Sequence, residues 1–329
     1  MTSHLNEDEI IGILKQNVGV VPKDILGIGD DAAVIHGVGG NNYVISQDHL
    51  VEGVHFRLTY FNPESLAHKV LHVNLSDIAA MGAKPQFVLL GLALPATLDM
   101  KWVQRFSESF LKLSLEHEVI LIGGDTTASS DQLYLGVTII GSAPIHHIKY
   151  RHKAKPGNII CVAGILGESF AGLRALEENK SGFEHLKTKS LRPQALLQEG
   201  AWLGKRPEVT AMMDISDGLY VDLQRLIKSS SVGARLVLDH LYPSKELQFG
   251  CVHLGLDVMQ CLLAGGEDYA LLFTVDASLY DRLAHQFQIE FNYSLQNIGN
   301  ITSEADIKLF QNEHEVSYHF RAYSHFDTH

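Results

Sequence analysis

The chain has 329 residues, with 26 lysines and arginines against 38 aspartates and glutamates, so its formal net charge is −12. The length favours two domains at roughly 150 residues each, and the acid excess argues against nucleic-acid or anionic-membrane partners because no basic stripe is present. The N-terminal MTSHLNEDEI is too acidic for a signal or transit peptide. Three cysteines, Cys161, Cys251 and Cys261, show no CxxC spacing, so we expect a cytoplasmic protein with reduced thiols.

Helical and strand patterns alternate through the first half of the chain. A capped helix is predicted from Asn6, because Glu9 follows three residues later and an apolar rhythm comes next. A second helix begins at Asn62-Pro63 and ends before Gly82, which places Asn74 and Asp77 on one face. The other predicted elements are strands over 43–46, 86–95 and 133–143, a helix over 99–118, and a buried strand over 119–124.

A basic segment over 144–157, with a proline near each end and no apolar periodicity, is the predicted linker. It divides the chain into domains over 1–145 and 146–329. The second half repeats the alternation, with strands over 158–164, 210–216, 235–238 and 269–275 and helices over 168–178, 193–203, 218–229 and 255–264. Two α+β halves of similar size are therefore expected.

Aspartates follow apolar runs or adjoin glycines at six separate places. They lie in the segments GIGDDAAV, SQD, NLSD, GGD, DISDG and GGED. Aspartate beside glycine can simply make turns, but repetition after buried strands favours a shared site at one edge of a sheet. Ionised carboxylates crowd together only around cations, and all-oxygen ligation favours Mg²⁺ or Ca²⁺ over Zn²⁺.

Several familiar motifs are incomplete. The segment Gly200 to Lys205 is one residue too short for a phosphate-binding P-loop, and no protein-kinase signature is present. His68 and His72 have the spacing of a zinc pair but lack the glutamate of HExxH, which favours a structural role. His55 follows the Asp48 motif closely and is either a phosphate contact or an ordinary structural histidine.

The segments GIGDDAAV, SQDHLVEGVHF, KVLHVNLSDIAAMGAKP, LIGGDTT, DISDGL and GGEDYALLFT, in this order and spacing, closely resemble the thiamine-monophosphate kinase family from about residue 8 to Phe326. That family belongs to the aminoimidazole-ribonucleotide-synthetase-like superfamily. The resemblance implies a two-domain α+β fold, with an N-terminal α+β domain that binds ATP and Mg²⁺ and dimerises through its sheet. A C-terminal α/β domain would complete the active site.

The resemblance also implies roles for individual residues. Matches to Mg²⁺-binding positions are Asp31, Ser46, Gln47, Asp48, Asp77, Asp125, Asp214 and Asp217. Matches to ATP contacts are Gly124, Asp125, Arg151 and Ser216, and matches to thiamine phosphate contacts are His55, Glu267 and Tyr323. The chain departs from the family at Gln47 and His49, where threonine is usual.

The implied reaction is ATP-dependent phosphorylation of thiamine monophosphate to thiamine diphosphate, by direct in-line transfer assisted by several Mg²⁺ ions, in a homodimer. No catalytic base is expected, because the acceptor phosphate has a second pKa near 6 and is largely dianionic at pH 7. The alternatives are another ATP-dependent synthetase or cyclase of the superfamily and a non-enzymatic ATP- or cation-binding module. A selenophosphate synthetase is disfavoured because the N-terminal region has no cysteine.

Overall fold

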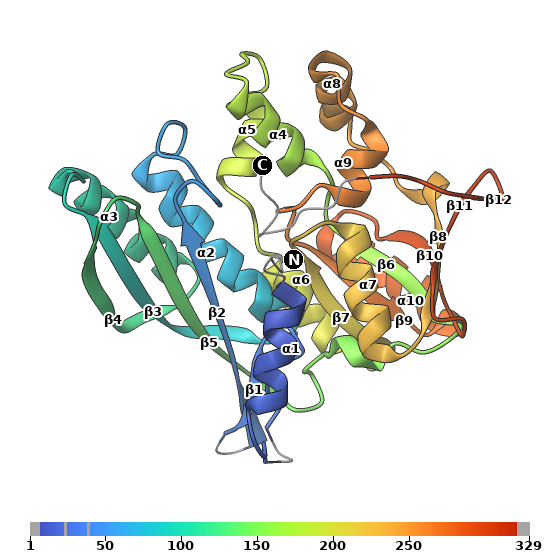
Figure 1. Cartoon of the computed structure of the whole chain (residues 1–329). Coiled ribbons are helices and arrows are strands. Elements are labelled where there is room, and N and C mark those ends of the chain that lie inside the picture. Colours follow the sequence, from blue (N-terminus) through green and yellow to red (C-terminus); the bar gives the residue numbers. More distant parts are fainter. Residues whose placement is uncertain (1–6, 23–24, 38–39, 321–329) are drawn as a thin grey trace, which may run out of the picture.

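The computed structural model describes residues 7–22, 25–37 and 40–320, which form two sheets with helices packed against both (Figure 1). The first sheet has five strands in the order β1-β2-β5-β3-β4, and only the β3–β4 pair is parallel. Its strands are β1 (Ala33–His36), β2 (Asn41–Val51), β3 (Lys84–Pro95), β4 (Ile120–Ser129) and β5 (Tyr134–Pro144). The helices of this half are α1 (Glu7–Asn17), α2 (Pro63–Ala80) and α3 (Met100–Glu116).

The second sheet has seven strands in the order β12-β11-β8-β10-β6-β9-β7, and all neighbours are antiparallel except β8 and β11. Its strands are β6 (Ile159–Ala163), β7 (Val209–Ile215), β8 (Gly233–Val237), β9 (Ala270–Val275), β10 (Gln296–Thr302), β11 (Ile307–Gln311) and β12 (His314–Val316). Both halves therefore mix helices and strands, and the two-domain α+β fold expected from the sequence is confirmed.

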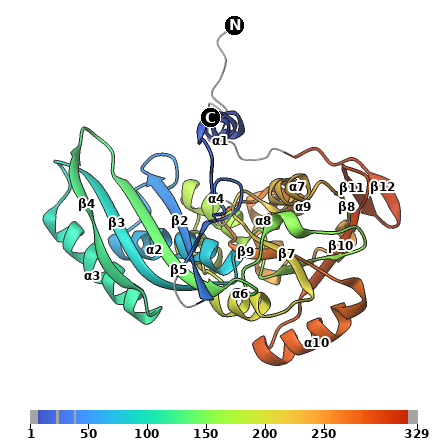
Figure 2. The ribbon, with the colours of Figure 1, turned by 90° about the horizontal axis from the view of Figure 1, so that it is seen from below.

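Helices cover both faces of the seven-stranded sheet. They are α4 (Glu168–Glu177), α5 (Glu184–Leu191), α6 (Leu197–Gly204), α7 (Leu219–Ser230), α8 (Lys245–Leu254), α9 (Val258–Ala264) and α10 (Tyr280–Phe291), with 3₁₀ turns η2 (Arg151–Lys153), η3 (Leu238–His240) and η4 (Ala277–Leu279). One core lies between the sheet and α4, α7, α8 and α9, and another lies under α6 and α10. Figure 2 shows α10 on the side opposite α7 and α9.

Helix α2 lies between the two halves of the molecule. Its first turn is fixed by a capping box, in which the Asn62 side chain accepts from the Ser65 N–H and the Ser65 hydroxyl accepts from the Asn62 N–H. Gly82, with φ of +68°, follows its end. The helix contacts β2 and β5 on one side and α6 and β7 on the other, so nearly all its side chains are buried. It thereby carries polar residues into the interface between the halves.

The structure corrects three expectations. The strand expected to be buried over 119–124 is β4, which runs on to Ser129 and is exposed along most of its length because it is an edge strand. The helix expected over 255–264 begins only at Val258, since Gly255 ends the preceding helix α8 with a left-handed φ and Asp257 caps α9. The expected linker over 144–157 contains η2 and the buried residues Ile148 and Lys149, so it packs as part of the fold.

Within the described part of the chain, no single helix has the length and apolar character needed to cross a membrane. The pair α8 and α9, bent by 119° at its break, passes that test by length and composition only. All three cysteines are free and buried.

Candidate functional site

Three aspartates that are distant in the sequence converge between the two sheets. Asp31 precedes β1, Asp77 lies in the last turn of α2, and Asp214 lies in β7. One carboxylate oxygen from each lies within 4.8 Å of the others. Because the sheets and α2 all contribute, this carboxylate cluster exists only when the two halves are packed together.

Neighbouring polar groups orient the carboxylate cluster. The Ser46 hydroxyl of β2 donates to Asp77 Oδ2, and the Ser76 hydroxyl donates to Asp214 Oδ2 at 2.6 Å. Asn74, one helical turn before Asp77, accepts from the Asp48 N–H at 3.2 Å. The helix face shared by Asn74 and Asp77 therefore lies against β2, which brings Asp48 beside the cluster.

Electrostatics in the cluster favour a bound cation. Burial, followed by repulsion from Asp48 and other carboxylates, raises the pKa of Asp77 well above its usual value. Burial and Asp31 do the same to the pKa of Asp214. The Oδ2 atom of Asp31 is buried and accepts no hydrogen bond from the described residues. An all-oxygen donor set with repelled charges and one unused acceptor fits Mg²⁺ or Ca²⁺.

Arg151 lies at one edge of the cluster. Its guanidinium donates to Asp31 Oδ1 and lies 3.5 Å from Asp30 Oδ1, and the backbone N–H of Arg151 donates to the Asp30 carboxylate at 3.3 Å. Burial, and then the charge of Asp31, raises the pKa of Asp30 to about 7. The sequence indicated Arg151 but not its pairing with Asp30, because the two are 121 residues apart.

The turn after β7 is organised by a residue that the sequence did not single out. The Asp222 carboxylate accepts from the N–H groups of both Ser216 and Asp217 at 3.0 Å. Arg225 pairs with Asp217 at 2.6 Å and with Asp222 at 2.8 Å. Burial, and then the charge of Asp217, raises the pKa of Asp222 to about 7. Asp217 thus faces Arg225, while the cluster itself contains Asp31, Asp77 and Asp214.

The GGEDY segment joins several elements at the cluster's other side. Glu267 pairs with Lys69 of α2, and Asp268 accepts from the Gly167 N–H at the start of α4 at 2.7 Å. Tyr269 is buried in the core of the N-terminal half. Burial, and then the charges of Glu267 and Asp48, raises the Tyr269 pKa well above its usual value. The phenol therefore lies within electrostatic range of both Glu267 and the carboxylates.

Asp125 and Gly124 lie apart from the cluster in the protomer. Across the sheet, Asp48 aligns with Val137, Val137 with Leu90, and Leu90 with Gly124. Three strand spacings of 4.7–4.9 Å give a separation of roughly 14 Å. Asp125 is the next residue along β4 and projects from the opposite face of the sheet. Both residues are exposed, and their strand β4 is at the outer edge of the sheet (Figure 1).

Three other residues that the sequence indicated, Gln47, His55 and Tyr323, are not members of the carboxylate cluster. Gln47 is exposed and lies on the face of β2 opposite Ser46 and Asp48, so only its backbone faces toward them. His55 is half-buried, and its Nδ1 accepts from the Val51 N–H at 3.0 Å, which assigns the proton of a neutral ring to Nε2. Tyr323 lies outside the described residues.

The histidine pair of α2 is separate from the carboxylate cluster. The rings of His68 and His72 stack at 4.0 Å, and His117 lies with its Nε2 3.2 Å from His72 Nε2. The Ala195 N–H donates to His72 Nδ1 at 3.2 Å. Burial is the main cause that lowers the pKa of His68 to about 4 and that of His72 to about 2, and the charge of Arg192 adds to it at His68. The rings are therefore neutral, bonded core residues near pH 7.

We expect His72→Gln to weaken the pH dependence of stability. His72 is neutral in the folded protein but titrates near 6.5 when unfolded, so stability falls as the pH drops below 6.5. At pH 5 this loss amounts to about 2 kcal/mol. Denaturant unfolding at pH 7 and pH 5 should show a drop smaller by about that amount in the variant. The exposed control His285→Gln should keep the full drop; an equal drop in His72→Gln would contradict the assignment.

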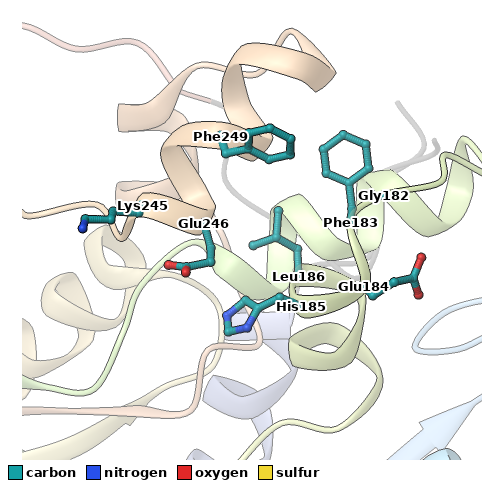
Figure 3. A pocket seen from close by; sticks show the side chains of 8 residues that line it. All are labelled: Gly182, Phe183, Glu184, His185, Leu186, Lys245, Glu246 and Phe249. Atoms are coloured by element: carbon teal, nitrogen blue, oxygen red, sulfur yellow. The ribbon is translucent and has the colours of Figure 1, made fainter.

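A cavity of about 270 Å³ lies away from these residues, between α5 and α8 (Figure 3). Its lining consists of Gly182, Phe183, Glu184, His185, Leu186, Lys245, Glu246 and Phe249. It shares no residue with the carboxylate cluster. We place the functional site at the cluster, because the convergent carboxylates and their raised pKa values are found there.

Known proteins resemble the chain over nearly its whole length. Family models match residues 29–143 (AIR synthase related protein, N-terminal domain) and residues 155–311 (AIR synthase related protein, C-terminal domain). A thiamine-monophosphate kinase from Buchnera aphidicola is 36% identical over 98% of this chain and 99% of its own length. That of Escherichia coli strain K12 is 36% identical over 92% of each. A solved structure of AaThiL complexed with AMPPCP and TMP has a TM-score of 0.85 at 29% identity, covering 99% of this chain and 100% of that one.

Proposed function

Because the chain belongs to the thiamine-monophosphate kinase family, we propose that it transfers the γ-phosphoryl group of ATP to thiamine monophosphate, giving thiamine diphosphate and ADP. The observation that carries the proposal is the carboxylate cluster, in which Asp31, Asp77 and Asp214 converge between the two halves. The similar structure that holds AMPPCP and TMP supports the same pair of substrates.

We propose that Mg²⁺ binds at Asp31, Asp77 and Asp214, with Ser46, Asp48 and the Gln47 backbone beside them and Asp217 at a further position. The oxygen donors and the unbonded Asp31 Oδ2 support this assignment. When bound, Mg²⁺ would neutralise charge between the two polyanionic substrates and favour in-line transfer. The carboxylates themselves fix where that positive charge is held.

The other residues of the site would bind and orient the substrates. We assign Arg151 and Ser216 to ATP, since Arg151 already faces anionic oxygens and would exchange Asp31 for phosphate. The His55 Nε2–H would donate to the acceptor phosphate, and Glu267 would face its cationic organic part, with Tyr323 assigned there by resemblance. No residue needs to remove a proton, because the acceptor phosphate is already largely dianionic at pH 7.

We further propose that the chain acts as a homodimer of two-domain protomers, divided near residues 145 and 146. The exposed edge strand β4 carries Ile120, Ile122 and Asp125, an arrangement suited to association with a second copy. Because Asp125 is remote from the cluster of its own protomer, we propose that it and Gly124 serve the ATP and metal site of the partner.

The reaction is tested with ATP, Mg²⁺ and thiamine monophosphate, measuring ADP and thiamine diphosphate by chromatography. Excess EDTA should lower turnover at least about 100-fold, and added Mg²⁺ should restore it, because the metal supplies several kcal/mol of charge stabilisation. Absence of thiamine diphosphate would refute the proposed kinase, and ADP formed only with aminoimidazole precursors would favour a synthetase. Full turnover in EDTA would refute the metal assignment alone.

A further inference from the structure

Lys69 is a buried lysine at the junction of the two halves. It lies on α2, and its side chain is 2% exposed. Its Nζ is 2.5 Å from Glu267 Oε1, in the loop between α9 and β9 of the C-terminal half. A buried ammonium is costly unless it is paired and hydrogen-bonded, so this contact constrains both partners.

The same ammonium group also holds the segment after β2. It donates to the His55 carbonyl at 3.0 Å and lies 5.3 Å from the centre of the Phe61 ring. The His55 ring is fixed separately, through the Val51 N–H. Lys69 therefore connects the backbone of His55, from one half of the chain, with the side chain of Glu267 from the other.

The loop that presents Glu267 has an unusual backbone. Glu267 and Tyr269 have φ of +63° and +51°, a conformation that costs non-glycine residues free energy and persists only when neighbouring contacts enforce it. The Glu267 N–H donates to the Ser216 carbonyl at 2.7 Å, and the Tyr269 N–H donates to the Ile215 carbonyl at 2.9 Å. The ion pair with Lys69 fixes the direction of the Glu267 side chain.

We propose that Lys69 is a positioning residue of the acceptor site, which holds Glu267 and the His55 segment in the one arrangement that receives thiamine monophosphate. This inference rests on the proposed function. Lys69 lies eight residues before Asp77 on α2, about 12 Å along the helix axis. An acceptor with its phosphate near the carboxylate cluster and its organic part near Glu267 would therefore lie along α2.

The first test compares the effects on the two Michaelis constants in Lys69→Met, which keeps most of the length of the side chain but removes its charge. The KM for thiamine monophosphate should rise roughly 10- to 100-fold, as expected for the loss of a buried charged hydrogen bond. The KM for ATP should stay within about twofold, because Lys69 contacts no ATP residue. An unchanged acceptor KM in an active variant would overturn the inference.

The second test is whether Lys69 acts through Glu267. In a Glu267→Gln background, Lys69→Met should raise the acceptor KM much less than it does in wild type, because the ion pair is already replaced by a weaker hydrogen bond to a neutral amide. Equal effects in both backgrounds would show that Lys69 does not act through Glu267. If wild-type protein forms no thiamine diphosphate, the proposed function fails and this inference fails with it, whereas wild-type turnover leaves the variants to decide.

Lys149→Met is the matched control for loss of a buried lysine. Lys149 is also buried, and its Nζ donates to the Arg206 carbonyl at 2.7 Å, without contact to His55 or Glu267. Thermal unfolding should show both variants to be less stable than wild type, but only Lys69→Met should change the acceptor KM. A rise in acceptor KM of the same size in Lys149→Met would attribute the effect to general loss of stability and overturn the inference.

Discussion

Asp77→Asn is expected to lower turnover at least about 10³-fold while leaving the metal-free protein at least as stable as wild type. Asparagine keeps an oxygen that can accept from the Ser46 hydroxyl, so the local hydrogen bond survives. It removes one negative charge from the carboxylate cluster, and the site loses the ligand that joins α2 to it. Catalysis should suffer because the remaining carboxylates would hold Mg²⁺ poorly.

The stability of the same variant follows from the sign of the pKa shift. The pKa of Asp77 is raised by burial and by neighbouring carboxylates, so the folded protein holds a proton that the unfolded chain releases above about pH 4. Wild-type stability therefore falls as the pH rises from that value through the folded pKa. Asparagine does not ionise, so in EDTA at pH 8 the variant should unfold at a higher temperature than wild type.

Thermal unfolding with EDTA and with Mg²⁺, together with the turnover assay, checks both halves of this prediction. Wild type should gain stability on addition of Mg²⁺, and Asp77→Asn should gain much less. Asp281→Asn, at an exposed position of α10, is the matched control and should behave like wild type. Near-normal turnover in Asp77→Asn would remove Asp77 from the metal site, and lower stability in EDTA would show that its charge is not repelled.

Much of the fold could be predicted because local signals determine it. Asn62, Pro63 and Gly82 mark the ends of α2, and the structure places them as the cap, the first residue and the left-handed position after the helix. Burial was harder to predict. The apolar run of β4 reads as a core strand, but it is exposed because no strand lies beyond it in the protomer's described sheet. Exposure depends on tertiary neighbours, which a local pattern does not contain.

The candidate site shows the same division. The sequence identifies the residues of the carboxylate cluster because aspartates recur after apolar runs. Their arrangement nevertheless differs from the expectation that all of them lie at the ends of strands along one edge of a sheet. Asp214 lies near the end of β7, whereas Asp77 lies on a helix and Asp31 precedes β1. The groups that support the site, Asp222 and Lys69 among them, carry no local motif. Their importance comes from contacts between segments that are distant in the chain.

Asp125→Asn is expected to abolish turnover, even though Asp125 follows Gly124, which lies roughly 14 Å from Asp48 across the sheet of the protomer. On the homodimer proposal, it serves the carboxylate cluster of the second copy. The variant should fold normally, because the Asp125 side chain is exposed and forms no hydrogen bond with the described residues of its own chain. Loss of its charge therefore breaks no contact within the protomer. Retained activity would exclude Asp125 from the site.

Mixing two inactive variants tells whether Asp125 acts within its own protomer or across the dimer. When Asp77→Asn and Asp125→Asn proteins are unfolded, combined and refolded together, half of the dimers should contain one copy of each. If Asp125 acts across the interface, each hybrid has one site with both aspartates intact, and the mixture should recover about a quarter of wild-type activity. If Asp125 acts within its own protomer, both sites of every hybrid carry a substitution and no activity returns. Size-exclusion chromatography must show dimers in the mixture, and a monomer with wild-type activity would refute the shared site.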